Sequence, residues 1–199
     1  MADEKNKRRS FAIFIVVIFL LAYYWNYEGY IVKRSADGKQ YYVKDYEHAE
    51  EAANMLSKIN HSVADLVTHL KNKYGKDHPN VRNILNRYNP DVIYEHTPSS
   101  FANDVAYTTM KGKSLYICLR DTDKQLHSLN VIMFVALHEL SHIATDARGH
   151  PREFWRTFKW ILQEADEINI YDPVNYRIHP ANYCGDMMIT YNPLNDVTL

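Results

Sequence analysis

A histidine motif inside an apolar run is the feature that most restricts how this chain can fold. The run Val131–Leu137 leads directly into His138-Glu139-Leu-Ser-His142, the pattern H-E-x-x-H. Residues four apart project from one face of a helix about one turn apart, so both imidazoles could hold one ion. Burying such polar groups is costly unless they are paired or bind a metal. We therefore expect a buried helix over 128–148 that presents two zinc ligands.

A third zinc ligand should follow this helix. His150 lies eight residues after His142, directly beyond Gly149, where a glycine break and a chain reversal could bring it back to the metal. Glu164, on the next expected helix, is the alternative third ligand. Glu139 is rotated by about 100° from His138, so it could reach a water at the metal without binding the ion. We expect one Zn²⁺ held by the three histidines, with Glu139 as the catalytic base.

Three other residues are candidates for supporting roles. Asp146 would lie one turn beyond His142 on the same helix face, where it could orient a ligand imidazole or simply remain solvated. Tyr183 and Tyr191 could each donate a hydrogen bond to an oxyanion that forms during catalysis.

Residue periodicity and turn signals predict the remaining elements. Apolar residues at three- and four-residue spacing predict a helix over 45–74, which Gly75 would end. Shorter patterns predict helices over 79–88 and 152–168, the latter opened by Pro151, and a strand over 92–96. Two hairpins are expected, over 31–43 around Asp37-Gly38 and over 105–119 around Lys111-Gly112. The tail from Tyr171 should be irregular but ordered.

The N-terminal segment is expected to be a membrane anchor. Residues 11–25 are apolar and uncharged and would rise roughly 22 Å as a helix, against ~30 Å of hydrocarbon. Flanking residues and snorkelling arginines extend this to a transmembrane helix over 10–27 that contacts the lipid bilayer. Basic residues in 1–9 place the N-terminus in the cytosol and the domain on the far side of a viral or host internal membrane. Aromatic residues within 23–27 would mark the far interface. Residues 28–44 would then be a connector and 45–199 the folded domain.

Charge and cysteine content exclude some functional classes. The formal net charge of −1 gives no basic field, so no nucleic-acid partner is predicted. Two cysteines, Cys118 and Cys184, rule out a disulfide scaffold and an all-cysteine zinc site. They could pair in an oxidising compartment, but two buried thiols are the simpler expectation.

The motif and the residues after it resemble a known family. His138-Glu-Leu-Ser-His142, followed by Gly149-His150-Pro-Arg-Glu-Phe-Trp155, resembles the compact zinc peptidases of the WLM, SprT-like and YgjP-like groups. The interval between the second and third histidines is longer here than is usual in that family. The resemblance implies an α+β fold, a minimal zincin-like domain of helices packed on a small antiparallel sheet, with Phe154 and Trp155 packed behind the third ligand. The whole chain also resembles metallopeptidase-like proteins of large DNA viruses.

These observations predict a membrane-anchored zinc metallopeptidase of the H-E-x-x-H type that acts on a protein or peptide substrate. Zinc would activate a water and Glu139 would act as the general base. The substrate should lie extended beside an edge strand, the one that ends near Leu119. The main alternative is a non-catalytic, zinc-stabilised membrane or virion protein with a structural or interaction role. A DNA-associated protease and a metal-free interaction protein are further alternatives.

Overall fold

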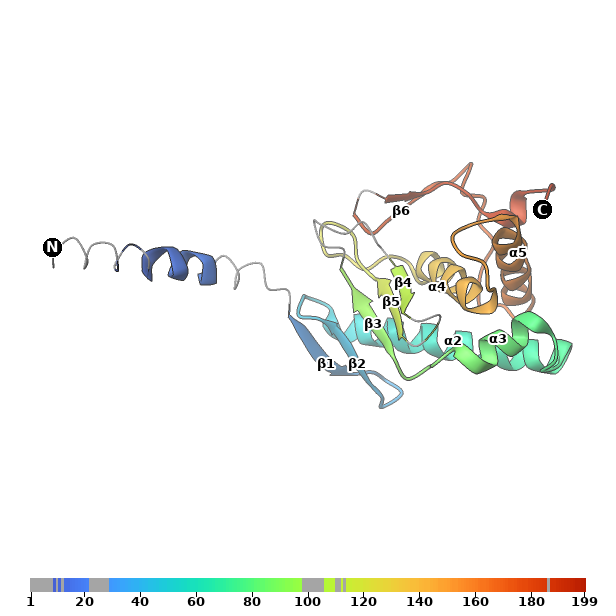
Figure 1. The fold of residues 1–199 in the computed structure, drawn as a ribbon, viewed down its shortest axis with the longest axis horizontal. Coiled ribbons are helices and arrows are strands. Elements are labelled where there is room, and N and C mark those ends of the chain that lie inside the picture. The colour runs from blue at the N-terminus through green and yellow to red at the C-terminus, as the bar shows by residue number, and fades with distance from the viewer. Residues whose placement is uncertain are drawn as a thin grey trace. The chain divides into compact units, whose positions relative to one another are not determined.

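The computed structural model describes residues 9, 11, 13–21, 29–97, 106–109, 112, 114–185 and 187–199. The chain divides into two compact units, residues 1–30 and residues 31–199. Figure 1 shows the strands and helices of the second unit, which contains the H-E-x-x-H motif.

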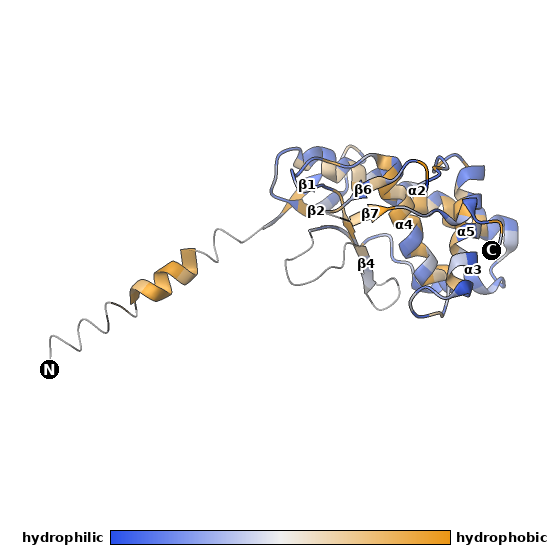
Figure 2. Cartoon of the chain, turned by 90° about the horizontal axis from the view of Figure 1, so that it is seen from above, coloured by the Kyte–Doolittle hydropathy of each residue, from blue (hydrophilic) through white to orange (hydrophobic). Residues whose placement is uncertain are grey.

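The N-terminal unit includes the segment for which we predicted a membrane-spanning helix over 10–27. Its described helical run, 13–21, is hydrophobic (Figure 2). Within the described part of the chain, no helix combines the length and apolar character that a membrane crossing needs. The predicted localisation, a single-pass membrane protein with its domain on the far side, is therefore contradicted. The predicted contact with the lipid bilayer stays a prediction. Residues 1–8 and the aromatic cluster in 23–27 lie outside the described residues.

The second unit is built on a five-stranded sheet with the order β1-β2-β3-β5-β4. The strands are β1 (Tyr30–Arg34), β2 (Gln40–Lys44), β3 (Ile93–His96), β4 (Ala106–Thr109) and β5 (Ser114–Cys118). The sheet therefore begins inside the segment that we expected to be a connector. Strand β3 is parallel to both β2 and β5, whereas β4 is antiparallel to β5. The expected antiparallel sheet is thus wrong, because two helices connect β2 to β3 and such a crossover returns the chain in the same direction.

The predicted hairpin over 105–119 is confirmed as β4 and β5. Their register pairs Ala106 with Ile117 and Thr109 with Ser114. Gly112 lies in the connection with a φ of 109°, and a Cβ there would lie 2.7 Å from the carbonyl oxygen of Arg87. Only glycine fits this position, which brings the hairpin against the end of a neighbouring helix. Residues 105, 110, 111 and 113 of the expected hairpin lie outside the described part of the chain.

Among the described residues, four α-helices complete the domain, close to their predicted positions. Helix α2 keeps its expected buried face and ends at Gly75, which has a φ of 79°. Apolar residues of α4 are buried on nearly all sides, and most of its length carries the hydrophobic colour in Figure 2. The bounds are α2 (Ala49–Tyr74), α3 (Pro79–Arg87), α4 (Leu129–Ala144) and α5 (Arg152–Glu167).

Helix α4 lies next to the outermost strand of the described sheet. Helices α2 and α4 contact the sheet, and α4 in turn packs against α3 and α5. Strand β5 lies between β3 and β4, so the edge beside α4 is β4. We expected the strand that ends near Leu119 to be the edge strand. This is wrong, because β4 pairs with the outer side of that strand, β5.

The tail contains more structure than we expected. A separate two-stranded sheet joins β6 (Ala181–Tyr183) to β7 (Met187–Ile189), and a short 3-10 helix η1 (Pro193–Asn195) follows. A disulfide between Cys118 and Cys184 ties this hairpin to the end of β5, with a Cα–Cα distance of 5.8 Å. The expectation of two unpaired thiols is therefore wrong. Their separation of 66 residues in sequence hid a close approach that only the fold creates.

Candidate metal centre and cleft

Helix α4 presents the first two histidines from a buried position. The side chain of Ser128 caps the helix by accepting a hydrogen bond from the Val131 N–H. Four residues apart, His138 and His142 lie one turn from each other with ring centroids separated by 4.9 Å. Burial lowers the pKa of His138 to about 3, with smaller contributions from its two histidine neighbours. That imidazole is therefore neutral at physiological pH, the form that can bind a metal ion.

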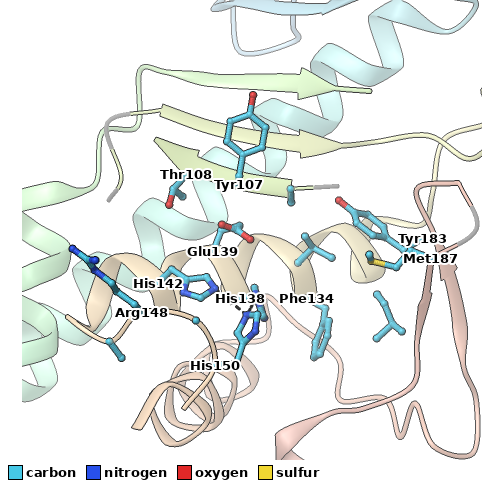
Figure 3. Close-up of a pocket in the computed structure, with 15 residues that line it drawn as sticks. Tyr107, Thr108, Phe134, His138, Glu139, His142, Arg148, His150, Tyr183 and Met187 are labelled. Atoms are coloured by element: carbon cyan, nitrogen blue, oxygen red, sulfur yellow. Dashed lines mark hydrogen bonds between the residues drawn. The ribbon is translucent and has the colours of Figure 1, made fainter. Parts of the chain in front are cut away.

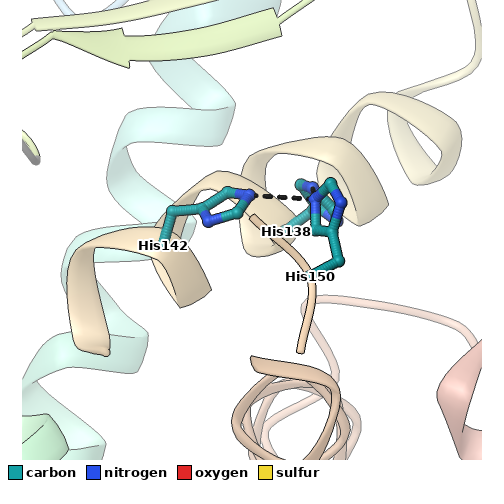
Figure 4. Close-up of side chains that lie close together, drawn as sticks. All are labelled: His138, His142 and His150. Carbon is teal, nitrogen blue, oxygen red and sulfur yellow. Dashed lines mark hydrogen bonds between the residues drawn. The ribbon is translucent and has the colours of Figure 1, made fainter. Parts of the chain in front are cut away.

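The chain leaves α4 earlier than the sequence predicted, and this brings the third histidine back. The Thr145 hydroxyl accepts a hydrogen bond from the Ala147 N–H and donates one to Glu153, so this residue directs the chain out of the helix. Gly149, with a φ of 66°, then reverses the chain. His150 follows and lies against the face of α4 that carries the other two histidines (Figure 4).

The three imidazoles converge through equivalent atoms. His150 Nε2 lies 3.1 Å from His142 Nε2 and 3.1 Å from His138 Nε2. One nitrogen from each ring lies within 4.8 Å of the other two. Burial also lowers the pKa of His150, which favours its neutral form.

This donor set fits zinc. Zinc–nitrogen bonds of about 2.0–2.1 Å in a tetrahedral site place two ligand nitrogens about 3.3 Å apart, close to the observed spacing. No fourth histidine, cysteine or acidic side chain joins the three histidines among the residues that the structure describes. Three protein ligands beside an open space are typical of catalytic zinc, whereas structural zinc is usually enclosed by four.

Aromatic side chains from α5 support the three rings from behind. Phe154 is fully buried, with ring centroids 4.9 Å from His138, 4.2 Å from His142 and 4.7 Å from His150. Trp155 lies 5.6 Å from the His150 ring. The resemblance implied that these two residues pack behind the third ligand, and Phe154 in fact contacts all three.

A cleft of about 610 Å³ opens beside the histidines, between α4 and the edge strand β4. Figure 3 shows the Glu139 carboxyl group in this cleft, below Tyr107 and Thr108 of β4. Glu139 is only 5% exposed, yet it lines the cleft together with the three histidines. A carboxylate in that place can exchange a proton with a molecule bound beside the histidines.

The two candidate tyrosines lie in different surroundings. Tyr183 lines the cleft and is 1% exposed. Burial raises its pKa, and the charge of nearby Glu139 raises it further, while a hydrogen bond with the Cys118 backbone acts in the opposite direction. The Tyr191 hydroxyl instead donates to Asp196 at 2.9 Å, and its ring packs edge-on against Trp155.

Two other predicted residues lie away from the histidine cluster. Asp146 lies beyond the end of α4, and its carboxylate accepts a hydrogen bond from Arg87 at 2.6 Å. Our expectation that it would share a helix face with His142 is wrong, because the turn at Thr145 ends the helix first. Glu164, the alternative third ligand, faces α2, where it accepts hydrogen bonds from His69 at 2.8 Å, Lys73 at 2.9 Å and Tyr74 at 2.5 Å.

One wall of the cleft consists of residues that were not predicted from the sequence. Phe134 of α4 lines the cleft together with Met187 and Ile189 of the β6–β7 hairpin. Phe134 precedes His138 by one helical turn, so its place could have been inferred from the motif. The hairpin residues follow from a long-range approach for which the two cysteines were the only sequence signal.

Comparison with known proteins finds relatives in viruses. It is 31% identical to the uncharacterized protein R325 of Acanthamoeba polyphaga mimivirus over 175 residues, which cover 86% of this chain and 88% of R325. The chain belongs to the R325 family. Shorter matches are found in the uncharacterized proteins 136R of Invertebrate iridescent virus 6, at 30% identity, and 042R of Invertebrate iridescent virus 3, at 34% identity. They cover 53% and 39% of this chain, and 53% and 48% of the respective relatives.

Two other comparisons add little to this assignment. No family model matches the chain. Among solved structures, Wss1 from Saccharomyces cerevisiae is similar with a TM-score of 0.48 and 21% identity, over 64% of this chain and 87% of Wss1.

Proposed function

We propose that this chain is a zinc-dependent metallopeptidase that hydrolyses peptide bonds in a protein or peptide substrate. The observation that carries this proposal is the convergence of three imidazole nitrogens, with His150 Nε2 3.1 Å from each of the other two, beside a cleft that a buried glutamate also lines. His138, His142 and His150 would hold the ion. When bound, zinc would polarise the scissile carbonyl group and lower the pKa of a water molecule.

The chain's own residues supply the remaining steps. Glu139 accepts a proton from the attacking water and delivers it to the leaving nitrogen. Edge strand β4 offers its backbone to an extended substrate, which adds to the sheet as a further strand. Tyr183 is our candidate donor to the oxyanion, because it lines the cleft and carries a hydroxyl group that can donate a hydrogen bond.

The alternative of a non-catalytic, zinc-stabilised module is less well supported. A purely structural zinc site would need neither an open cleft nor a buried carboxylate facing into it. Glu139 is only 5% exposed and still lines the cleft beside the three histidines, a place from which a carboxylate can act on a bound molecule.

Metal content and turnover together test the proposal. The full chain should bind one zinc ion, and Glu139→Gln should keep that ion while kcat falls by about 10²–10⁴. His150→Ala should lose both the zinc and the activity. His179→Ala, which replaces an exposed histidine outside the cleft, is the matched control and should keep both. Elemental analysis and hydrolysis of a denatured protein substrate provide the measurements. Full turnover in Glu139→Gln would exclude the proposed base, and retained stoichiometric zinc in His150→Ala would exclude the third ligand.

A further inference from the structure

The β6–β7 hairpin forms an apolar wall at one end of the cleft. Side chains alternate between the two faces of a strand, so Met187 and Ile189 project to one side of β7 and Met188 to the other. Met187 and Ile189 line the cleft, whereas Met188 does not. Tyr183 is the cross-strand partner of Met187, so the cleft side of the hairpin is built from large, largely apolar side chains.

Helix α4 completes this wall. Phe134 and Val135 are 6% and 8% exposed and line the same cleft. Figure 3 shows Phe134 on the same side of His138 as Tyr183 and Met187, while His142 and Arg148 lie on the opposite side. Phe134 is one helical turn from His138, so the apolar wall begins directly beside the candidate metal centre.

The hairpin is held in place before any substrate arrives. The Cys118–Cys184 disulfide joins its turn to β5, and the Cys184 N–H donates a hydrogen bond to His127 at 3.0 Å. Tyr183 also packs against the His127 ring at a centroid distance of 5.4 Å. A wall fixed in this way loses little conformational entropy on binding, which favours selectivity.

The direction of β4 orients the substrate relative to this wall. In Figure 3, Tyr107 lies nearer to Tyr183 and Thr108 nearer to His142, so β4 runs from the apolar end of the cleft towards His142. A peptide that pairs antiparallel with β4, the more stable arrangement, runs the opposite way. Its residues after the scissile bond therefore lie over Phe134, Met187 and Ile189.

We propose that the β6–β7 hairpin and Phe134 form a specificity pocket that selects a large apolar side chain immediately after the scissile bond. This inference rests on the proposed peptidase function and narrows its substrate class. The chain should cut on the amino side of residues such as leucine or phenylalanine, which become the new N-termini. A small residue in that position would leave the pocket unfilled. A charged residue would place an uncompensated charge against the apolar side chains.

A peptide series tests this pocket. The zinc-loaded full chain is given peptides that differ only at one central position, occupied by leucine, phenylalanine, glycine or aspartate, and the cut sites are read by mass spectrometry. We expect kcat/KM for the leucine and phenylalanine peptides to exceed that for glycine and aspartate by about tenfold or more. Equal rates across the series, or cuts that follow the apolar residue, would overturn the pocket.

Two neighbouring methionines provide a matched pair of variants. Met187→Asp should lower kcat/KM for the leucine peptide by about tenfold while zinc content is unchanged. Met188→Asp places the same charge one residue away on the other face of β7, and it should stay within about twofold of the wild type. The two methionines are 44% and 53% exposed, so both substitutions should leave the fold intact. Equal losses of kcat/KM in the two variants would contradict the proposal that the Met187 face of β7 contacts the substrate.

Binding to the inactive Glu139→Gln protein separates the pocket from the catalytic proposal. Fluorescence anisotropy should give a Kd for the leucine peptide about tenfold lower than that for the glycine peptide. Selective binding without any hydrolysis by the wild type would refute the peptidase function and retain the pocket. Hydrolysis without selectivity in binding or rate would refute the pocket and retain the peptidase function.

Discussion

Phe154 is the residue on which the geometry of the three histidines most depends. Its ring is fully buried and contacts all three imidazoles, and it stacks on His142 with an interplanar angle of 27°. A ligand ring can bind metal well only if its orientation is fixed before the ion arrives, because every freely rotating ring adds an entropic cost. Phe154 supplies that orientation without binding metal itself.

We therefore expect Phe154→Ala to weaken zinc binding by about 10–100-fold, and to lower the free energy of unfolding of the zinc-free protein by about 3–5 kcal/mol. Competition with a chelator and urea denaturation provide the two measurements. Phe154→Leu retains most of the apolar volume, so it should lose less zinc affinity and less unfolding free energy than Phe154→Ala. Unchanged zinc affinity in a folded Phe154→Ala protein would contradict this role.

Glu164 contributes to stability rather than to the metal centre. Burial by itself would raise its pKa, but hydrogen bonds from Tyr74, Lys73 and His69 outweigh that effect and leave the pKa below its ordinary value. A group with a lowered pKa in the folded state stabilises the fold above its unfolded pKa of about 4.3, and this contribution is lost as the pH falls through the folded pKa.

Glu164→Gln should therefore cost about 1–3 kcal/mol of unfolding free energy at pH 7, and the difference from the wild type should shrink as the pH falls below about 4. Urea denaturation at several pH values measures this difference. Glu167→Gln is the control, since Glu167 also pairs with Lys73 but its side chain is 53% exposed, and its loss should be smaller. A cost for Glu164→Gln that does not change with pH would argue against an ionised carboxylate.

Among the elements, the β4–β5 hairpin sets the width of the cleft. Strand β4 and Glu139 both line the cleft, and a Cβ at Gly112 in the hairpin connection would lie 2.7 Å from the carbonyl oxygen of Arg87. A Cβ at position 112 would also lie 3.1 Å from the Ile143 side chain of α4. The same small residue therefore fixes the distance between the edge strand and the helix that carries the histidines.

Gly112→Ala should destabilise the protein by about 1–3 kcal/mol and raise KM for peptide substrates, because the hairpin must shift away from α3 and α4. Thermal unfolding and steady-state kinetics test both effects. Gly38→Ala is a suitable control, since Gly38 has a similar φ of 83° but a Cβ at that position would meet no atom within 4 Å. It should cost about 1 kcal/mol and leave KM unchanged. Equal changes of stability and KM in the two variants would show that the close approach of position 112 to Arg87 has no influence on the cleft.

Local sequence signals were sufficient for most elements and insufficient for their arrangement. The repeating apolar face of α2, from Ala49 to Leu70, predicted a helix whose end at Gly75 is confirmed. The end of α4 was predicted too late, because Thr145 forms side-chain hydrogen bonds that compete with the helix and leave no pattern of their own. The direction of β3 could not be read from its residues, since it depends on the helical crossover that precedes it.

The candidate site shows the same division. His138, Glu139 and His142 are fixed relative to one another by helix geometry, so their grouping could be foreseen from four-residue spacing. His150 comes back to the other two histidines through a short turn at Gly149, so its position could also be anticipated. The hairpin residue Met187 reaches the cleft through contacts far apart in sequence, which no local pattern encodes.

At the scale of the whole molecule, the disulfide joins the five-stranded sheet to the β6–β7 hairpin, which lines one end of the cleft. In a chain-entropy estimate, a bridge that closes a loop of 66 residues stabilises the folded state by about 4 kcal/mol. Replacing both Cys118 and Cys184 by serine should lower the free energy of unfolding by about this amount. In the zinc-free protein, dithiothreitol should have a similar effect on the wild type and none on the double variant. Equal stability of wild type and variant in urea without reductant would contradict the bridge.

The position of the bridge has a further consequence for the integrity of the protein. The segment from Cys118 to Cys184 contains α4, His150 and α5, and the sulfur–sulfur bond turns this segment into a covalent ring. One backbone cut inside the ring opens it without releasing either fragment. A nicked molecule would therefore migrate as an intact chain in non-reducing electrophoresis, and self-cleavage within the ring would become visible only after reduction.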